Sequence, residues 1–128
     1  MTVTKKTRLL AKPGPVINSV YSEGHEGEPD KLFDGSNVHV LGSNLNLANG
    51  LRIRFYATNG DAFVAFFDED YAIGKADGHW TYKGDWIYER MRNVCMVSGL
   101  ELDLNRGGSI ELASDEETMA ARPVAFDA

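Results

Sequence analysis

The sequence is poor in cysteine and has no long apolar run, and both shortages restrict what the protein can be. Cys95 is the one cysteine among 128 residues, so no disulfide can form within the chain and no cysteine cluster can bind a metal. It stands in the apolar string 94–97, a setting that favours a small buried side chain over a reactive thiol. No apolar run approaches the roughly 20 residues of a membrane-spanning helix. We therefore expect neither a disulfide framework nor a membrane partner.

Motifs for phosphate binding, metal binding and hydrolysis are also missing. Gly-Ser-Asn occurs at 35–37 and again at 42–44, but neither copy has the ending of a phosphate loop or a helix directly after it. His25 has no second histidine four residues on, and no Gly-x-Ser-x-Gly elbow occurs. The acidic run 68–70 is followed by alanine and isoleucine where a calcium loop needs an oxygen ligand and glycine, so a solvated loop explains it better. We predict no enzyme activity, no cofactor and no metal.

Positive charge is concentrated at the N-terminus of an otherwise acidic chain. The net charge is −6, and residues 1–12 carry four basic residues and no acid, so the remaining residues sum to −10. An acidic body repels nucleic-acid backbones, so we expect no nucleic-acid partner. The basic segment either binds an acidic protein partner or is a solvated tail. The candidate partner-binding residues are Lys5, Lys6, Arg8 and Lys12.

The N-terminus also predicts where the protein is made and how it is divided. Its apolar patch, 9–11, is too short for a signal peptide, so we expect cytoplasmic synthesis. Pro13 and Pro15 around Gly14 resist both helix and sheet. We therefore divide the chain into an arm and linker, 1–14, and a single domain, 15–128.

Alternating and apolar segments predict strands in the first half of the domain. The segment 15–22 is rich in β-branched residues, and 38–41 alternates between the two Gly-Ser-Asn turns. In 51–58, Leu, Ile and Phe face one way and arginines the other. Asn59-Gly60 predicts a type I′ hairpin turn. The return strand, 62–67, is almost wholly apolar, which indicates either a central strand covered on both faces or a strand covered by a partner.

The second half of the chain predicts further hairpins and one ambiguous segment. A hairpin over 79–88 has either a three-residue or a two-residue loop, and 86–97 fits a helix almost as well as a strand. We expect another hairpin over 100–114, a helical turn or loop at 114–121, and a closing strand at 122–126. About eight short strands at regular spacing predict an all-β sandwich.

Two strand patterns resemble those of a known family. The matching residues are Pro15, Ile17 and Val20, then Gly35, Val38, Val40, Gly42 and Leu45. This arrangement resembles the opening of IPT/TIG-type immunoglobulin-like (E-set) domains. The segments 108–112 and 122–126 are similar to the last strands of an uncharacterised bacterial Ig-like domain often found behind HU-like domains. The resemblance implies an immunoglobulin-like antiparallel β-sandwich, here with an N-terminal extended arm; it implies no activity.

Four aromatic residues form the candidate ligand face: Trp80, Tyr82, Trp86 and Tyr88. With a three-residue loop in the 79–88 hairpin, all four project from one face. Such a platform, with Lys83, Asp85 and Glu89 nearby, suits carbohydrate. The competing interpretation, which we favour, is that these side chains fill the core.

Two functions follow from the sequence. The first is a non-enzymatic structural or interaction module, an accessory or decoration protein that docks through its arm on a larger assembly such as a phage particle. Its partner would then be a protein, for example of a phage capsid, and its location the virion. The alternative is a carbohydrate-binding module that uses the aromatic 79–88 hairpin.

Overall fold

The computed structural model describes residues 14–115 and 117–127, and this part of the chain is mostly β. Its strands are β1 (Val16–Ser22), β2 (Lys31–Phe33), β3 (Val38–Ser43), β4 (Gly50–Tyr56), β5 (Ala62–Phe67), β6 (Ala72–Ala76), β7 (His79–Tyr82), β8 (Gly108–Ser114) and β9 (Glu117–Asp127). Its helices are α2 (Ile87–Val97) and three short 3-10 helices, η1 (Leu45–Leu47), η2 (Glu69–Tyr71) and η3 (Leu104–Arg106). The all-β class predicted from the alternating patterns is thereby confirmed.

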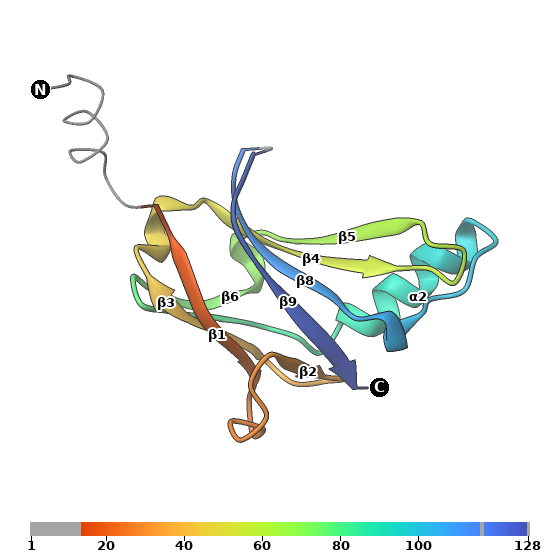
Figure 1. Ribbon diagram of the computed structural model, residues 1–128, viewed down its shortest axis with the longest axis horizontal. Coiled ribbons are helices and arrows are strands. Elements are labelled where there is room, and N and C mark those ends of the chain that lie inside the picture. Colours follow the sequence, from red (N-terminus) through yellow and green to blue (C-terminus); the bar gives the residue numbers. More distant parts are fainter. Residues whose placement is uncertain (1–13, 116, 128) are drawn as a thin grey trace, which may run out of the picture.

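The strands are hydrogen-bonded into one sheet, in the order β5-β4-β8-β9-β2-β1-β3-β7-β6. Figure 1 shows that this sheet is curled, and that α2 lies beside β4 and β5 at one end. The buried side chains of both halves of the sheet form a single hydrophobic cluster, in which Trp80, Tyr82, Phe55 and Phe67 are the largest. Burial of these large aromatic surfaces is the main favourable contribution to folding.

The predicted strand at 38–41 is confirmed, although it continues further than its alternation indicated. It forms β3, in which Val38 and Val40 are buried. The strand includes Gly42, the first residue of the second Gly-Ser-Asn. Gly42 is therefore a strand residue and not a turn residue. A Cβ at Gly42 would lie 1.9 Å from the carbonyl oxygen of Val16, so glycine is required because the β1 backbone approaches closely.

The hairpin predicted at Asn59-Gly60 is present, but its turn is not of type I′. Only Gly60 has a positive φ, of 97°, whereas a type I′ turn needs two such residues. The Ala57 N–H donates to the carbonyl oxygen of Asp61 (2.8 Å), which leaves a three-residue loop. The Asn59 side chain accepts a hydrogen bond from the Asp61 N–H (3.0 Å) and stabilises this wider turn.

The return strand of that hairpin, β5, lies at an edge of the sheet and is not central. Among the described residues it pairs with β4 alone, and β6 forms the opposite edge. Phe67 and Ala65 of β5 are buried, while Val64 and Phe66 on the outer face are 41% and 54% exposed. The prediction of a central strand covered on both faces is therefore wrong. Its stated alternative, a strand covered by a partner, stays a prediction.

The predicted second hairpin over 79–88 is wrong, because the chain becomes helical after β7. The buried residues Ile87, Met91 and Cys95 recur every four positions and place one face of α2 on the core. Before the helix, a Cβ at Gly84 would lie 1.9 Å from the carbonyl oxygen of Ser36. The backbone at Gly84 therefore packs directly against the segment that contains Ser36, and the chain does not form a hairpin there. Of the two structures considered for 86–97, the helix is present.

The C-terminal hairpin lies later in the sequence than predicted. Residues 100–107 contain a single isolated β-bridge, Ala57 to Leu102, followed by η3, so they do not form the first strand of a hairpin. Instead β8 pairs with β4 on one side and with β9 on the other. The segment 114–121, expected to be a helical turn or a loop, contains the β8–β9 turn and the start of β9. The closing strand at 122–126 is confirmed as the end of that long strand.

An ion pair joins the two halves of the sheet where β9 changes partner. β9 pairs with β8 as far as Val124 and with β2 from Ala125. The Arg122 guanidinium donates two hydrogen bonds to the Asp30 carboxylate (2.7 and 2.9 Å) and a longer one to the carbonyl oxygen of Ile17 in β1 (3.4 Å). These bonds lower the pKa of Asp30 below its usual range.

We predict that Arg122→Gln lowers the free energy of unfolding by about 1–2 kcal/mol at pH 7, because it removes a bidentate pair that is about one-third exposed. The lowered pKa of Asp30 stabilises the fold above the ordinary pKa of aspartate, and this contribution is lost as the pH falls through the folded-state pKa. Urea unfolding should therefore show that the difference between wild type and variant shrinks as the pH falls below the ordinary pKa of aspartate.

Arg92→Gln is the matched control, because the pair of Arg92 with Asp34 is longer (3.9 Å) and its two side chains are nearly half exposed. We expect this substitution to change stability little at any pH. Equal losses in the two variants, or a loss at Arg122 that does not depend on pH, would contradict the role given to the Asp30 pair.

Candidate functional site

The two groups of residues singled out in the sequence are placed very differently by the structure. The partner-binding residues Lys5, Lys6, Arg8 and Lys12 lie outside the described residues. The four aromatic residues lie within them, on two elements, β7 and the start of α2. They can therefore be tested as a common ligand face.

Three of the four aromatic residues are core side chains. Trp80 and Tyr82 are fully buried, and Tyr88 is 2% exposed. The Trp80 indole N–H donates to the side-chain oxygen of Asn46 (2.7 Å), and the Tyr88 hydroxyl donates to the carbonyl oxygen of Leu32 (2.6 Å). Burial raises the pKa of Tyr88, and it raises that of Tyr82 to about 12. These three residues fill the core, so they do not present the exposed platform that carbohydrate binding would need.

Trp86, the fourth aromatic residue, lies apart from the other three at the end of a surface groove. Its ring packs edge-on against Phe67 (centroids 5.0 Å apart) and at a tilt against Tyr71 (4.5 Å). The Arg90 guanidinium lies over the indole at 5.1 Å, in the geometry of a cation–π contact. Trp86 therefore anchors the groove at the point where α2 begins.

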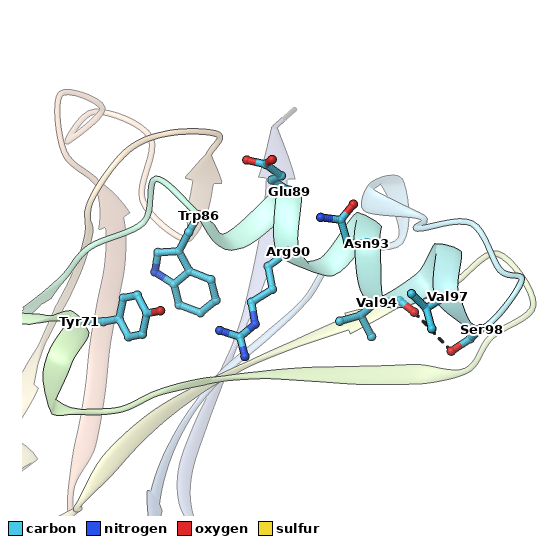
Figure 2. A pocket seen from close by; sticks show the side chains of 8 residues that line it. All are labelled: Tyr71, Trp86, Glu89, Arg90, Asn93, Val94, Val97 and Ser98. Atoms are coloured by element: carbon cyan, nitrogen blue, oxygen red, sulfur yellow. Dashed lines mark hydrogen bonds between the residues drawn. The ribbon is translucent and has the colours of Figure 1, made fainter.

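The groove runs along α2 and has a volume of about 520 Å³. It is lined by Tyr71, Trp86, Glu89, Arg90, Asn93, Val94, Val97 and Ser98. Figure 2 shows that Trp86, Arg90 and Val94 project from α2 toward the strand that runs along the helix, which is β5. Val94 and Val97 remain exposed although they are apolar, so the groove presents apolar surface to solvent.

The backbone of β5 adds hydrogen-bonding groups beside this groove. In an antiparallel ladder, alternate residues bond to the neighbouring strand and the others point away. The hydrogen-bonded pair Ala57–Asp61 at the turn fixes this alternation, so Phe63, Ala65 and Phe67 bond to β4. The N–H and C=O groups of Ala62, Val64 and Phe66 therefore point outward. We use the name β5 edge for the side of the strand that points away from β4, together with the exposed side chains of Val64 and Phe66.

Charged groups lie at both ends of the β5 edge. Asp61 precedes the strand, and Asp68 and Asp70 follow it, all exposed. Two strands away, on the outer face of the sheet, Glu111 of β8 accepts a hydrogen bond from Arg54 of β4 (2.8 Å) and lies 3.6 Å from Arg52. Burial alone would raise the pKa of Glu111, but Arg54 and the hydroxyls of Ser109 and Thr118 lower it, so its carboxylate stays charged and neutralises one of the two arginines.

Sequence reasoning missed the groove and the β5 edge as a site. A second stripe on α2, formed by Trp86, Arg90, Val94 and Val97, recurs at helical spacing beside the core-facing stripe. If 86–97 had been assigned as a helix, that periodicity could have indicated the groove. Nothing in the near-continuous apolarity of 62–67 distinguishes an edge strand from a central one.

Comparisons with known proteins do not identify this site. No protein-family model, no curated protein and no solved structure matches the chain. Among the described residues, no group of three or more His, Cys, Asp or Glu side chains is arranged to hold a metal ion. No helix in the same part of the chain is both long and apolar enough to cross a membrane.

We predict that Trp80→Ala lowers the free energy of unfolding by about 3–5 kcal/mol, because it leaves a large cavity in the core. Trp86→Ala should lower it by only about 1–2 kcal/mol, because that ring is partly exposed in the groove. Chemical denaturation of both variants measures the difference. Equal losses would mean that Trp86 is as much a core residue as Trp80.

Proposed function

We propose that the protein is a non-enzymatic structural module that assembles with copies of itself, by binding the N-terminal arm of one copy along the β5 edge of another. The observation that carries this proposal is an edge strand with outward-pointing backbone groups and exposed apolar side chains, Val64 and Phe66, next to an apolar groove. An unpaired edge of this kind is a template for an added strand.

Strand addition fits both chemical features of the site. The outward N–H and C=O groups of Ala62, Val64 and Phe66 offer main-chain hydrogen bonds to an extended segment. The groove beside them, with Trp86 and Val94 in its lining, offers apolar contacts to alternate side chains of that segment. Main-chain pairing supplies affinity, and the groove supplies specificity.

The arm has the composition that this site would bind. Residues 1–12 carry four positive charges, while Asp61, Asp68 and Asp70 lie at the two ends of the β5 edge. The arm also contains Val3, Leu9 and Leu10, which suit an apolar groove. In Figure 1, β1, which follows the arm, begins at the other end of the molecule from α2. This separation favours a groove on a second copy over one on the same chain.

Two finer predictions from the sequence are included in this proposal. The immunoglobulin-like assignment is supported by the order of the opening strands, in which β1 pairs antiparallel with β3. The role of accessory or decoration protein in a phage particle is supported by the basic arm alone. The carbohydrate alternative has less support, since three of its four aromatic residues, Trp80, Tyr82 and Tyr88, are buried.

The proposal predicts that a charge placed on the β5 edge blocks assembly without unfolding the protein. Phe66→Lys should shift the wild-type oligomer to monomer in light scattering after gel filtration, at an almost unchanged melting temperature, because the side chain is 54% exposed. Deletion of residues 1–12 should have the same effect. Raising the salt concentration should weaken the wild-type oligomer, since exposed charges are screened.

Ile73→Lys is the matched control, because Ile73 is 53% exposed on β6, the opposite edge of the sheet. It should leave assembly intact. A monomeric wild type at high protein concentration would refute self-assembly. An oligomer that survives Phe66→Lys would show that the interface lies elsewhere.

A further inference from the structure

Two histidines that lie 40 positions apart in the sequence meet on the outer face of the sheet. His39 lies on β3 and His79 on β7, and their neighbours Val40 and Trp80 point into the core. His39 is paired directly with Thr81, so His79, two residues before Thr81, is its diagonal neighbour on the same face. The Nδ1 atom of His39 and the Nε2 atom of His79 are 2.7 Å apart.

A carboxylate fixes the orientation of one of the two rings. The Nε2 atom of His39 is 3.1 Å from Oε1 of Glu23, and the His39 side chain is 12% exposed. A carboxylate can only accept, so His39 Nε2–H donates, and in the neutral ring Nδ1 is left as an acceptor. Asn37 donates from its side-chain amide to the other oxygen of Glu23 (3.3 Å). The lone pair of His39 Nδ1 is thereby directed toward His79.

We propose that His39 Nδ1 and His79 Nε2 form a binding site for a divalent transition-metal ion of the zinc type. Imidazole nitrogen is a common ligand for such ions, at about 2.0–2.1 Å. In tetrahedral geometry two such ligands lie about 3.3 Å apart, so the observed pair would open by roughly 0.6 Å. The hydrogen bond from the second nitrogen of His39 to a carboxylate is the outer-shell arrangement that is usual for a metal-binding histidine.

The metal would complete its coordination with groups from outside this pair. The described residues contribute no third His, Cys, Asp or Glu ligand at this position. The Thr81 hydroxyl lies 3.2 Å from His39 Nδ1 and is at best a weak metal ligand. Two positions are thus left for water or for an anionic group of a partner. Two ligands bind less tightly than the four of a structural zinc site, so the site suits reversible binding. The charge of −10 on residues 13–128 favours cations generally.

Zinc titration of the full-length, tag-free protein at pH 7.5 tests this proposal. Calorimetry with Zn²⁺ should show one saturable site in the wild type. His79→Ala and His39→Ala should each lower the affinity at least tenfold. Glu23→Gln should lower it by about tenfold or more, because loss of an outer-shell carboxylate typically costs 10–100-fold. Imidazole nitrogen chemical shifts should move for His39 and His79.

His25→Ala is the matched control, because His25 is the third of three histidines in the chain and stacks on Phe33 (centroids 3.7 Å apart) rather than on His39 or His79. It should bind zinc like the wild type. If the wild type binds no more zinc than the His39→Ala/His79→Ala double variant, the two histidines form only a cross-strand hydrogen bond and the proposal is overturned. It is also overturned if His25→Ala loses as much affinity as the other two. Should His39→Ala fail to fold, His79→Ala decides, since His79 is exposed.

Discussion

The fold depends on one strand that belongs to both halves of the sheet. β9 is antiparallel to β8 over most of its length and parallel to β2 at its end, so a single continuous backbone joins the two halves of the sheet. β2 pairs only with the end of β9. Before that point, the Arg122–Asp30 pair takes the place of ladder hydrogen bonds between β9 and the β1 side of the sheet. The strand ladder itself joins the two halves of the sheet by only three residue pairs, between β2 and β9.

This topology also explains why β5 is available to a partner. A sheet that curls without closing leaves two edges, and here they are β5 and β6. Natural proteins protect exposed edges with charge, shortness or a covering element. Both strands have charged neighbours, but α2 approaches β5 without covering its outer face, where Val64 and Phe66 remain exposed. An apolar edge is a liability for a monomer and an advantage for an assembling protein.

The sequence predicted the local β pattern well and the long-range arrangement poorly. Alternation is a property of neighbouring residues, so the strands at 51–58 and 38–41 could be identified from Ile53, Phe55 and Val40 alone. The edge position of β5 could not, because it depends on which strands pair across the whole chain. The prediction of a hairpin at 79–88 was wrong for a similar reason. Tyr88 lies on a helix, α2, that only tertiary contacts distinguish from a strand.

The candidate site was predictable only in part. The excess of positive charge at Lys5, Lys6, Arg8 and Lys12 is evident in composition, and it led directly to the prediction of a docking arm. The surface that we propose for it is formed by β5 and α2, which are brought together by the fold. The His39–His79 pair was missed because its residues lie 40 positions apart and meet only through the β3–β7 register.

Amide hydrogen exchange is the most direct test of the claim that the arm adds a strand to β5. The measurement compares protein lacking residues 1–12 before and after addition of a synthetic peptide of that sequence, residue by residue. We predict that the outward-pointing amides of Ala62, Val64 and Phe66 become protected, while those of β6 exchange as before. Saturating peptide that leaves these three amides unprotected would contradict it.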